Sequence, residues 1–383
     1  MHRPGNEHLA SYAMRVEESQ GRRYPEPPHP FRNDYERDRD RIVHSRAFRR
    51  LENKTQVFTR RYSDHFRTRL THTLEVAQIS RTVAKALGLN RDLVEALALV
   101  HDVGHPPFGH AGESELNRLM ARHQDSFDHN LHALRIVEHF EQKYAEFPGL
   151  NLTFEVREGI IKHSREYDPA RYPDLAAYAL DARPPLEAQL IDRADEIAYN
   201  CADLDDGYEA KLLTLPLIRR GLGLFDSLYR TVERKYPSAR EKLKFNEALK
   251  AMLNILVTDL IGSTRRRLAQ ARVRSVADVR AQSRRLVCLG PRRARDNKEL
   301  KEFLNVNLYS HHQVGSERKG IVRLVRRLFN YYLEHPRALP AFYFAQSQRE
   351  PLHRVVCDYI AGMTDNYLQL QYRRHLGPRA GKL

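Results

Sequence analysis

Apolar residues recur every three or four positions along most of the chain after residue 68, which is typical of amphipathic helices. In the stretch "LTHTLEVAQISRTVAKALGLN", one helical face carries His72, Val76, Ile79 and Val83. Gly88 follows, and glycine is common just after the end of a helix. The pattern predicts a helix that ends near Gly88 and turns His72 toward the apolar interior.

A second helix is predicted directly after the first, in "RDLVEALALVHDVG". Asn90 can cap its first turn, and Leu93, Leu97 and His101 follow one another at intervals of four. We expect Gly104 to end this helix. His101 would then lie on the apolar face of a helix next to the one that carries His72.

Two further stretches read as long helices, "PPLEAQLIDRADEIAYNCADLDDG" and "FNEALKAMLNILVTDLIGSTRRRLAQ". No series of segments alternates with a period of two, and no repeat of fixed length is present. Residues 24–30 hold four prolines in seven positions, which excludes a helix or a central strand there. We therefore predict an all-α fold, with an N-terminal arm (1–30), a core (31–215) and a helical C-terminal region (216–383) packed on that core.

Composition narrows the class of protein. The chain has 383 residues and is 41% hydrophobic, which is enough for a sizeable core, but no apolar run approaches the length of a membrane span. The N-terminus has no apolar signal-peptide region. Cys201, Cys288 and Cys357 are far apart and form no metal or redox motif, so we expect ordinary thiols in a reducing cytoplasm.

The formal net charge of +15 predicts a polyanionic partner, such as nucleic acid, a nucleotide or an anionic lipid. Residues 265–295 concentrate this charge, with eleven arginines and one acid, Asp278. Two interpretations stay open for this cluster: a solvated helix face, or a contact with single-stranded DNA or with the phosphates of a nucleotide effector.

The stretch "HDVGHPPFGH" (101–110) concentrates side chains that bind metals. Imidazole nitrogens and carboxylate oxygens on rigid elements suit a divalent metal ion. His72, His101 and Asp102 are therefore candidate ligands, with a turn through Gly104 and the two following prolines that lets neighbouring side chains converge.

A fourth ligand is needed from elsewhere. Asp195, Tyr199 and Asp203 form one stripe on the predicted helix in "DRADEIAYNCADLDDG", because they are four residues apart. Such a stripe is compatible with a solvent-facing surface as well as with a site, and spacing alone does not decide between the two.

Five motifs then occur in the order of a known family: "RDRIVHSRAFRRLENKTQVF", "TRLTHTLEVAQISR", "HDVGHPPFGHAGE", "FDHN" and "ADEIAYNCADLDD". The chain resembles the HD-domain phosphohydrolases, and within them the shorter, dGTPase-like branch of the bacterial deoxyguanosine triphosphate triphosphohydrolase family. The resemblance implies an HD-domain helical bundle with additional C-terminal helices. A weaker match, "LKEFLNVNLYSHHQV" (300–314), extends it toward the C-terminus.

The implied reaction is hydrolysis of a dNTP, with dGTP the expected substrate, to deoxynucleoside and inorganic tripolyphosphate. The resemblance makes His72, His101, Asp102 and Asp195 the ligands of one divalent metal ion. Histidine and carboxylate ligands fit Mg, Mn, Fe or Zn by geometry, and phosphate chemistry favours Mg or Mn among these.

A leaving 5′ oxygen needs a proton, so the site needs a general acid. The resemblance makes His110 and Glu113 an acid–base pair, with Glu113 orienting the ring of His110, and leaves open whether His110 acts on the water or on the leaving oxygen. It also places His105 and His129 on the phosphate side of the substrate.

For the substrate, the resemblance places Gln56, Tyr199 and Asp203 near the deoxyribose, where a close-packed tyrosine would exclude a 2′ hydroxyl. Four basic residues are candidates for binding the triphosphate: Arg49, Lys54, Arg69 and Lys162.

The family further implies a homo-oligomer, a tetramer or a hexamer. Two alternatives remain open: another HD-type nucleotidase or phosphodiesterase, and a protein that binds single-stranded nucleic acid and uses the HD site for regulation.

Overall fold

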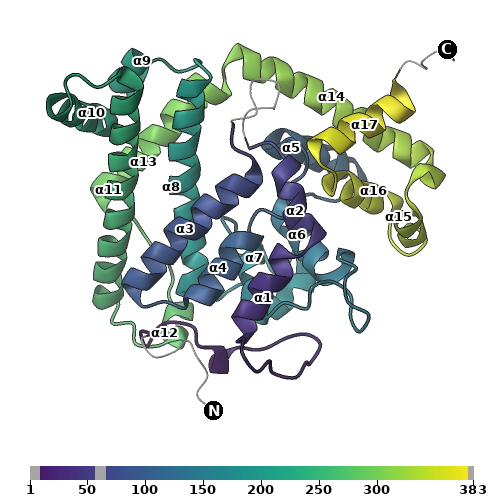
Figure 1. The fold of residues 1–383 in the computed structure, drawn as a ribbon. Coiled ribbons are helices and arrows are strands. Elements are labelled where there is room, and N and C mark those ends of the chain that lie inside the picture. Colours follow the sequence, from purple (N-terminus) through teal and green to yellow (C-terminus); the bar gives the residue numbers. More distant parts are fainter. Residues whose placement is uncertain (1–8, 57–65, 378–383) are drawn as a thin grey trace. The chain divides into compact units, whose positions relative to one another are not determined.

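The computed structural model describes residues 9–56 and 66–377. Within these residues the regular structure is helical, and β-pairing is limited to two isolated bridges, Arg22–Thr153 and Thr55–Thr68 (Figure 1). The prediction of an all-α fold is confirmed.

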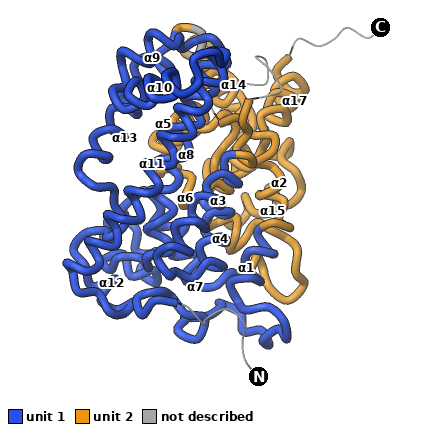
Figure 2. The backbone as a smooth tube through the Cα atoms, turned by 60° about the vertical axis from the view of Figure 1, so that its left-hand side comes forward, with its two compact units in different colours: residues 1–42, 72–101, 151–311 blue, residues 43–71, 102–150, 312–383 orange. Residues whose placement is uncertain are grey.

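The chain forms two compact units whose segments alternate along the sequence (Figure 2). The first unit comprises residues 1–42, 72–101 and 151–311, and the second comprises 43–71, 102–150 and 312–383. The boundary between His101 and Asp102 falls inside the "HD" dipeptide itself. The predicted limits of an arm, a core and a C-terminal region at residues 30 and 215 stay a prediction.

The first unit is built around α8, which packs against α4, α7, α11 and α13. Its helices are α1 (Asp34–Val43), most of α3 (Arg69–Leu87), α4 (Arg91–Val100), α7 (Phe154–Ile161), α8 (Leu186–Glu209), α9 (Leu215–Gly221), α10 (Gly223–Lys235), α11 (Glu241–Gln270), α12 (Val276–Arg280) and α13 (Pro291–Leu304).

Local sequence signals set the ends of α3 and α4. Gly88 has a φ of +68°, which a glycine adopts without strain, and α3 ends just before it. The Asn90 side chain accepts hydrogen bonds from the amides of Asp92 and Leu93 and so caps α4. The expected stop at Gly104 is wrong: α4 ends at Val100, and His101 is its C-cap residue.

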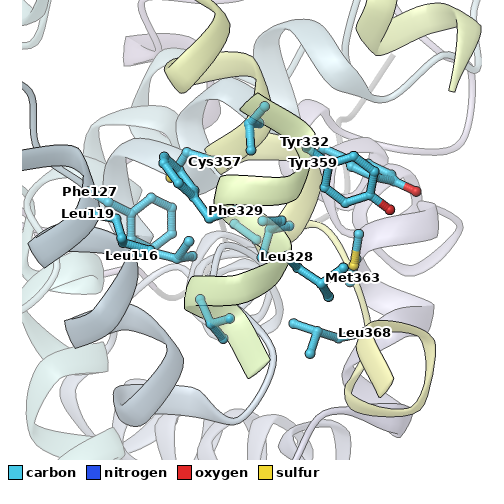
Figure 3. Packing of buried hydrophobic residues seen from close by; sticks show 14 of the residues in the cluster. Leu116, Leu119, Phe127, Leu328, Phe329, Tyr332, Cys357, Tyr359, Met363 and Leu368 are labelled. Atoms are coloured by element: carbon cyan, nitrogen blue, oxygen red, sulfur yellow. The ribbon is translucent and has the colours of Figure 1, made fainter. Parts of the chain in front are cut away.

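The second unit has a hydrophobic core formed by α5, α14, α16 and α17 (Figure 3). Its helices are α2 (Arg46–Arg50), α5 (Gly109–Met120), α6 (His129–Arg135), α14 (His312–Glu334), α15 (Ala341–Gln346), α16 (Leu352–Ala361) and α17 (Asp365–Leu376). Leu116 of α5, Leu328 of α14 and Tyr359 of α16 are among the buried members of this core. Residues near position 110 and residues after position 350 are thereby held together.

The three cysteines are free thiols, and Cys201 and Cys357 are buried. Among the described helices, none combines the length and the apolar character that crossing a membrane requires.

Candidate functional site

The first unit brings His72, His101 and Asp195 together from three helices. The Nε2 atom of His72 in α3 lies 2.8 Å from Oδ1 of Asp195 in α8. The Nε2 atom of His101, at the end of α4, lies 3.8 Å from the same oxygen. The two imidazole rings are 5.8 Å apart. Three of the four predicted metal ligands thus share one buried cluster.

His163 belongs to the same cluster and was missed by the sequence analysis. Its ring lies 5.3 Å from that of His101, and its Nε2 atom lies 3.8 Å from Oδ2 of Asp195. Its Nδ1 atom lies 2.7 Å from Oδ1 of Asp192. The available signal was a histidine shortly after the apolar helix α7, but periodicity does not show which residues it meets.

The chemistry of these donors fits a divalent metal ion. One donor atom each from His101, His163 and Asp195 lie within 4.8 Å of one another. Burial raises the pKa of Asp195, but the hydrogen bond with His72 and the nearby imidazoles outweigh it and hold that pKa well below its usual range. A carboxylate among imidazoles is a donor set for divalent transition metals and, with added water, for Mg or Mn.

Asp102 follows His101 in the chain and is the first residue of the second of the three segments that make up the second unit. Its two oxygens have different partners: Oδ2 accepts from the guanidinium of Arg69 at 2.9 Å, and Oδ1 lies 2.9 Å from Nδ1 of His105. All three side chains are buried. The fourth predicted ligand is therefore held in one orientation by an arginine and a histidine.

Glu113 of α5 connects two of the predicted catalytic histidines within the second unit. Its Oε2 atom lies 3.2 Å from Nδ1 of His110, and its Oε1 atom lies 2.8 Å from Nδ1 of His129. The His129 amide also donates to Oε1, at 3.2 Å. The contact of Glu113 with His110 was predicted from the sequence, whereas this contact with His129 was not.

The electrostatics of this network keep Glu113 ionised. Burial raises the pKa of Glu113, but its hydrogen bonds with His110 and His129 hold it far below the usual range. His105 stacks on His129, with ring centroids 3.9 Å apart. Burial, together with the charges of Arg69 and His129, lowers the pKa of His105 well below its usual value, so His105 is neutral at pH 7. The His110 side chain is 79% exposed and open to a ligand.

Two glycines shape this loop for different reasons. Gly109 has a φ of +54°, and a Cβ atom there would lie 2.6 Å from the Arg69 guanidinium. A Cβ atom on Gly104 would lie 1.9 Å from the carbonyl oxygen of His129. Gly104 therefore permits the close approach of α6, in addition to lying in the turn that the sequence predicted.

The predicted sugar-contacting residues fall in different units. Tyr199 and Asp203 lie on α8 in the first unit, and Gln56 is half-buried in the second. The hydroxyl of Tyr309, at the end of the short helix η6 (Asn305–Tyr309), donates a hydrogen bond to Asp203. Tyr309 lies in the stretch "LKEFLNVNLYSHHQV" (300–314), and its contact with Asp203 was not predicted from the sequence.

The predicted triphosphate-binding cations differ in their surroundings. Lys54 is buried and donates to the carbonyl oxygens of His105 and Ala361. Lys162 is also buried, with Glu158 at 2.8 Å and two carbonyl oxygens as further acceptors. Arg49 is exposed. Structural partners therefore surround Lys54 and Lys162, and phosphate binding by these two stays a prediction.

The arginine cluster at 265–295 divides into two groups. Arg280 forms two hydrogen bonds to the carboxylate of Glu158, at 2.7 and 2.9 Å, and Arg285 pairs with Asp192. These arginines stabilise the first unit. Asp192, the partner of Arg285, is also the partner of His163. Exposed members include Arg272 and Arg284, for which a polyanion contact remains a prediction.

Comparisons with known proteins agree with this geometry. The model of the HD domain family matches residues 69–200, and that of the phosphohydrolase-associated domain matches residues 287–374. Two chains named deoxyguanosinetriphosphate triphosphohydrolase-like protein, from Bordetella parapertussis and Azoarcus sp., are each 46% identical to this chain. Each match covers 96% of this chain and 96% of the relative's own length. One of the same name from Geobacter metallireducens is 44% identical over 97% of this chain and 95% of its own length.

Proposed function

Because the chain belongs to the deoxyguanosinetriphosphate triphosphohydrolase-like family of HD-domain phosphohydrolases, we propose that it hydrolyses dNTPs to deoxynucleoside and inorganic tripolyphosphate. dGTP is the first substrate to test. The observation that carries the proposal is the network in which Glu113 contacts both His110 and His129. A metal site alone does not require this network, whereas expulsion of a 5′ alkoxide requires an oriented proton donor.

In this proposal, the metal ligands are His72, His101, Asp102 and Asp195. A divalent cation held there, Mg or Mn, would supply the positive charge that polarises the α-phosphate and orients a water molecule. Arg69 and His105 hold the carboxylate of Asp102 for this role.

The acid–base chemistry is assigned to the second unit. Water attacks the α-phosphorus, the bond from phosphorus to the 5′ oxygen breaks, and His110 gives its proton to that oxygen. The proton released by the attacking water then returns His110 to its protonated form. Glu113 accepts from His110 and fixes the direction of the ring, as a carboxylate does for the histidine of a catalytic triad. His129 and the neutral His105 face the phosphates as hydrogen-bonding groups.

Selection for deoxyribose is assigned to Tyr199, Asp203 and Gln56. A carboxylate and an amide can bond the 3′ hydroxyl, and a packed tyrosine leaves no room at the 2′ position. The hydrogen bond from Tyr309 would orient the Asp203 carboxylate for this contact. Arg49, Arg69, Lys54 and Lys162 remain the proposed source of positive charge for the triphosphate.

We further propose that the active species is a homo-oligomer, a tetramer or a hexamer, and that the exposed arginines of residues 265–295 contact a nucleotide effector or single-stranded DNA. Sedimentation at working concentration tests the first statement. Salt-dependent binding of single strands tests the second.

Product analysis tests the proposed reaction. The purified protein is incubated with each dNTP and with Mn or Mg, and the phosphorus-containing products are resolved by ³¹P NMR. We expect tripolyphosphate and deoxynucleoside, and no product in the presence of a chelator. Release of orthophosphate or pyrophosphate without tripolyphosphate would reject the proposal. Activity on monophosphates or cyclic nucleotides alone would favour another HD-type nucleotidase or phosphodiesterase.

A further inference from the structure

One carboxylate near the C-terminus holds two segments that are far away in the sequence. Asp365, the first residue of α17, is 7% exposed. Its Oδ2 atom accepts from the amide of Thr55 at 2.8 Å and also from the Thr55 hydroxyl. Its Oδ1 atom accepts from the amide of Phe108 at 2.8 Å. All these residues belong to the second unit.

Both segments lead directly to proposed site residues. Thr55 precedes Gln56, the proposed sugar contact. Phe108 has a left-handed conformation, with a φ of +59°, and lies two residues before His110. A change in either backbone segment would move the functional side chain attached to it.

The Thr55 segment is in turn paired with the start of α3. The amide of Arg69 donates to the carbonyl oxygen of Lys54 at 3.1 Å, and Thr55 forms a bridge with Thr68. The Arg69 guanidinium also packs against Gly109, where a Cβ atom would approach to 2.6 Å. The two segments that Asp365 holds are therefore in contact with each other through Arg69.

The turn that carries Asp365 is well anchored. Arg50 donates to the carbonyl oxygen of Gly362 at 2.8 Å, and Lys54 donates to that of Ala361. Met363 and Leu368, on either side of Asp365, are buried in the core of the second unit (Figure 3). These hydrogen bonds and the packing of the core therefore fix the position of the backbone that carries the Asp365 carboxylate.

A carboxylate suits this position because backbone amides withdrawn from water need acceptors, and hydrogen bonds to an ionised acceptor are the stronger ones. Burial raises the pKa of Asp365, while the bonds from Thr55 and Phe108 oppose that rise. An alanine at this position would leave two amides without their acceptor.

We propose that Asp365 is a positioning residue through which the phosphohydrolase-associated region sets the relative placement of Gln56 and His110. This inference rests on the proposed function for the roles of those two residues. It assigns to the C-terminal region a part in catalysis that does not involve contact with the substrate.

Two kinds of measurement test the proposal. The first is steady-state kinetics on dGTP for Asp365→Ala, Asp365→Asn and Thr55→Val. A misplacement of about 1 Å can cost about 100-fold in rate, so we expect Asp365→Ala to lose about that much in kcat/KM. Asp365→Asn, which keeps one acceptor oxygen, should lie between Asp365→Ala and the wild type. Thr55→Val removes only the hydroxyl donor, so it should raise KM through Gln56 and change kcat by less than about threefold.

The second measurement is hydrogen exchange of peptides covering residues 51–56 and 106–112, which needs no substrate. We expect faster exchange than in the wild type in both peptides of Asp365→Ala, and in at least one of the two peptides of Asp365→Asn, which keeps a single acceptor oxygen. Asp125→Asn is the matched control, because Asp125 pairs with Arg354 of α16 in the same unit but contacts neither segment. Its kinetics and its exchange in both peptides should equal those of the wild type.

The outcomes separate this proposal from the proposed function. Wild-type kinetics in both Asp365 variants would overturn it, and so would unchanged exchange in the two peptides. If Asp365→Ala does not fold, Asp365→Asn and Thr55→Val decide the question. If the wild type releases no tripolyphosphate, the proposed function fails, and the exchange data still report whether Asp365 orders both segments.

Discussion

Arg69 donates a hydrogen bond to Asp102 across 2.9 Å, between two side chains that are almost completely buried. The pair joins the first residue of α3 to the second residue of the "HD" dipeptide. Breaking a buried ion pair is costly because the remaining charge has lost its partner. Arg69 therefore has a structural role beside any contact with substrate.

Replacing Arg69 by methionine should lower the free energy of unfolding by about 3–5 kcal/mol in the presence of a chelator. Saturating Mn should reduce this loss, because a cation bound by Asp102 would supply positive charge in place of the guanidinium. Urea unfolding with and without Mn measures both effects. An equal loss under the two conditions would contradict the assignment of Asp102 as a metal ligand.

His110→Ala should lower kcat by about 10²- to 10⁴-fold, because it removes proton transfer to the leaving oxygen. Since its side chain is 79% exposed, we expect the melting temperature and the metal content to stay those of the wild type. Turnover, calorimetry and metal analysis of one preparation check all three. Unchanged turnover would show the acid–base assignment to be wrong, and loss of metal would place His110 among the ligands.

Asp195→Ala should abolish retention of Mn after dialysis, because it removes a carboxylate that lies beside three imidazoles. Asp205→Ala on the same helix is the matched control, since Asp205 pairs with Lys242 and is not among the proposed ligands. Metal content by mass spectrometry should fall only for Asp195→Ala. Equal metal content in the two variants would remove Asp195 from the site.

Tyr309→Phe should raise KM for dGTP by about 3- to 10-fold, which corresponds to the usual net free energy of one hydrogen bond. The change frees the Asp203 carboxylate from the hydroxyl that orients it, while the proposed acid–base groups remain intact. Tyr208→Phe serves for comparison, because the Tyr208 hydroxyl donates to Glu241 in the same unit. A KM that is the same in both variants would argue against a sugar contact by Asp203.

Lys54 gives a pH dependence of stability. Burial, followed by the charges of Arg50 and Arg69, lowers the pKa of Lys54 to about 7, against about 10.4 in an unfolded chain. The unfolded state binds the proton more tightly, so this contribution to stability rises with pH between about 7 and 10.4 and is lost as the pH falls. Relative to Lys54→Met, the wild type should gain about 1 kcal/mol per pH unit in this window. Parallel unfolding curves across the window would show that Lys54 keeps an ordinary pKa.

Some features of the site follow from the sequence because they depend on local geometry. Gly88 sets the end of α3 and Asn90 sets the start of α4. The start of α8, directly after Pro184 and Pro185, also agrees with the helix predicted there. Glu113 meets His110 because residues three apart on a helix face each other. The helical periodicity also predicted that His72 and His101 face the interior, and both side chains are buried.

Other features were settled only by tertiary packing, since they join residues with no local relationship. Tyr309 and Asp203 are 106 positions apart, Asp365 and Thr55 are 310 apart, and the link of His163 to the cluster depends on how α7 packs. The burial of Lys54 and Lys162 likewise depends on which carbonyl oxygens the folded chain brings to them. A helix repeats its own pattern every few residues, so sequence spacing shows which side chains share a face. Sequence spacing does not show which distant part of the chain such a face packs against, because that depends on how all the helices together bury their apolar residues in one core.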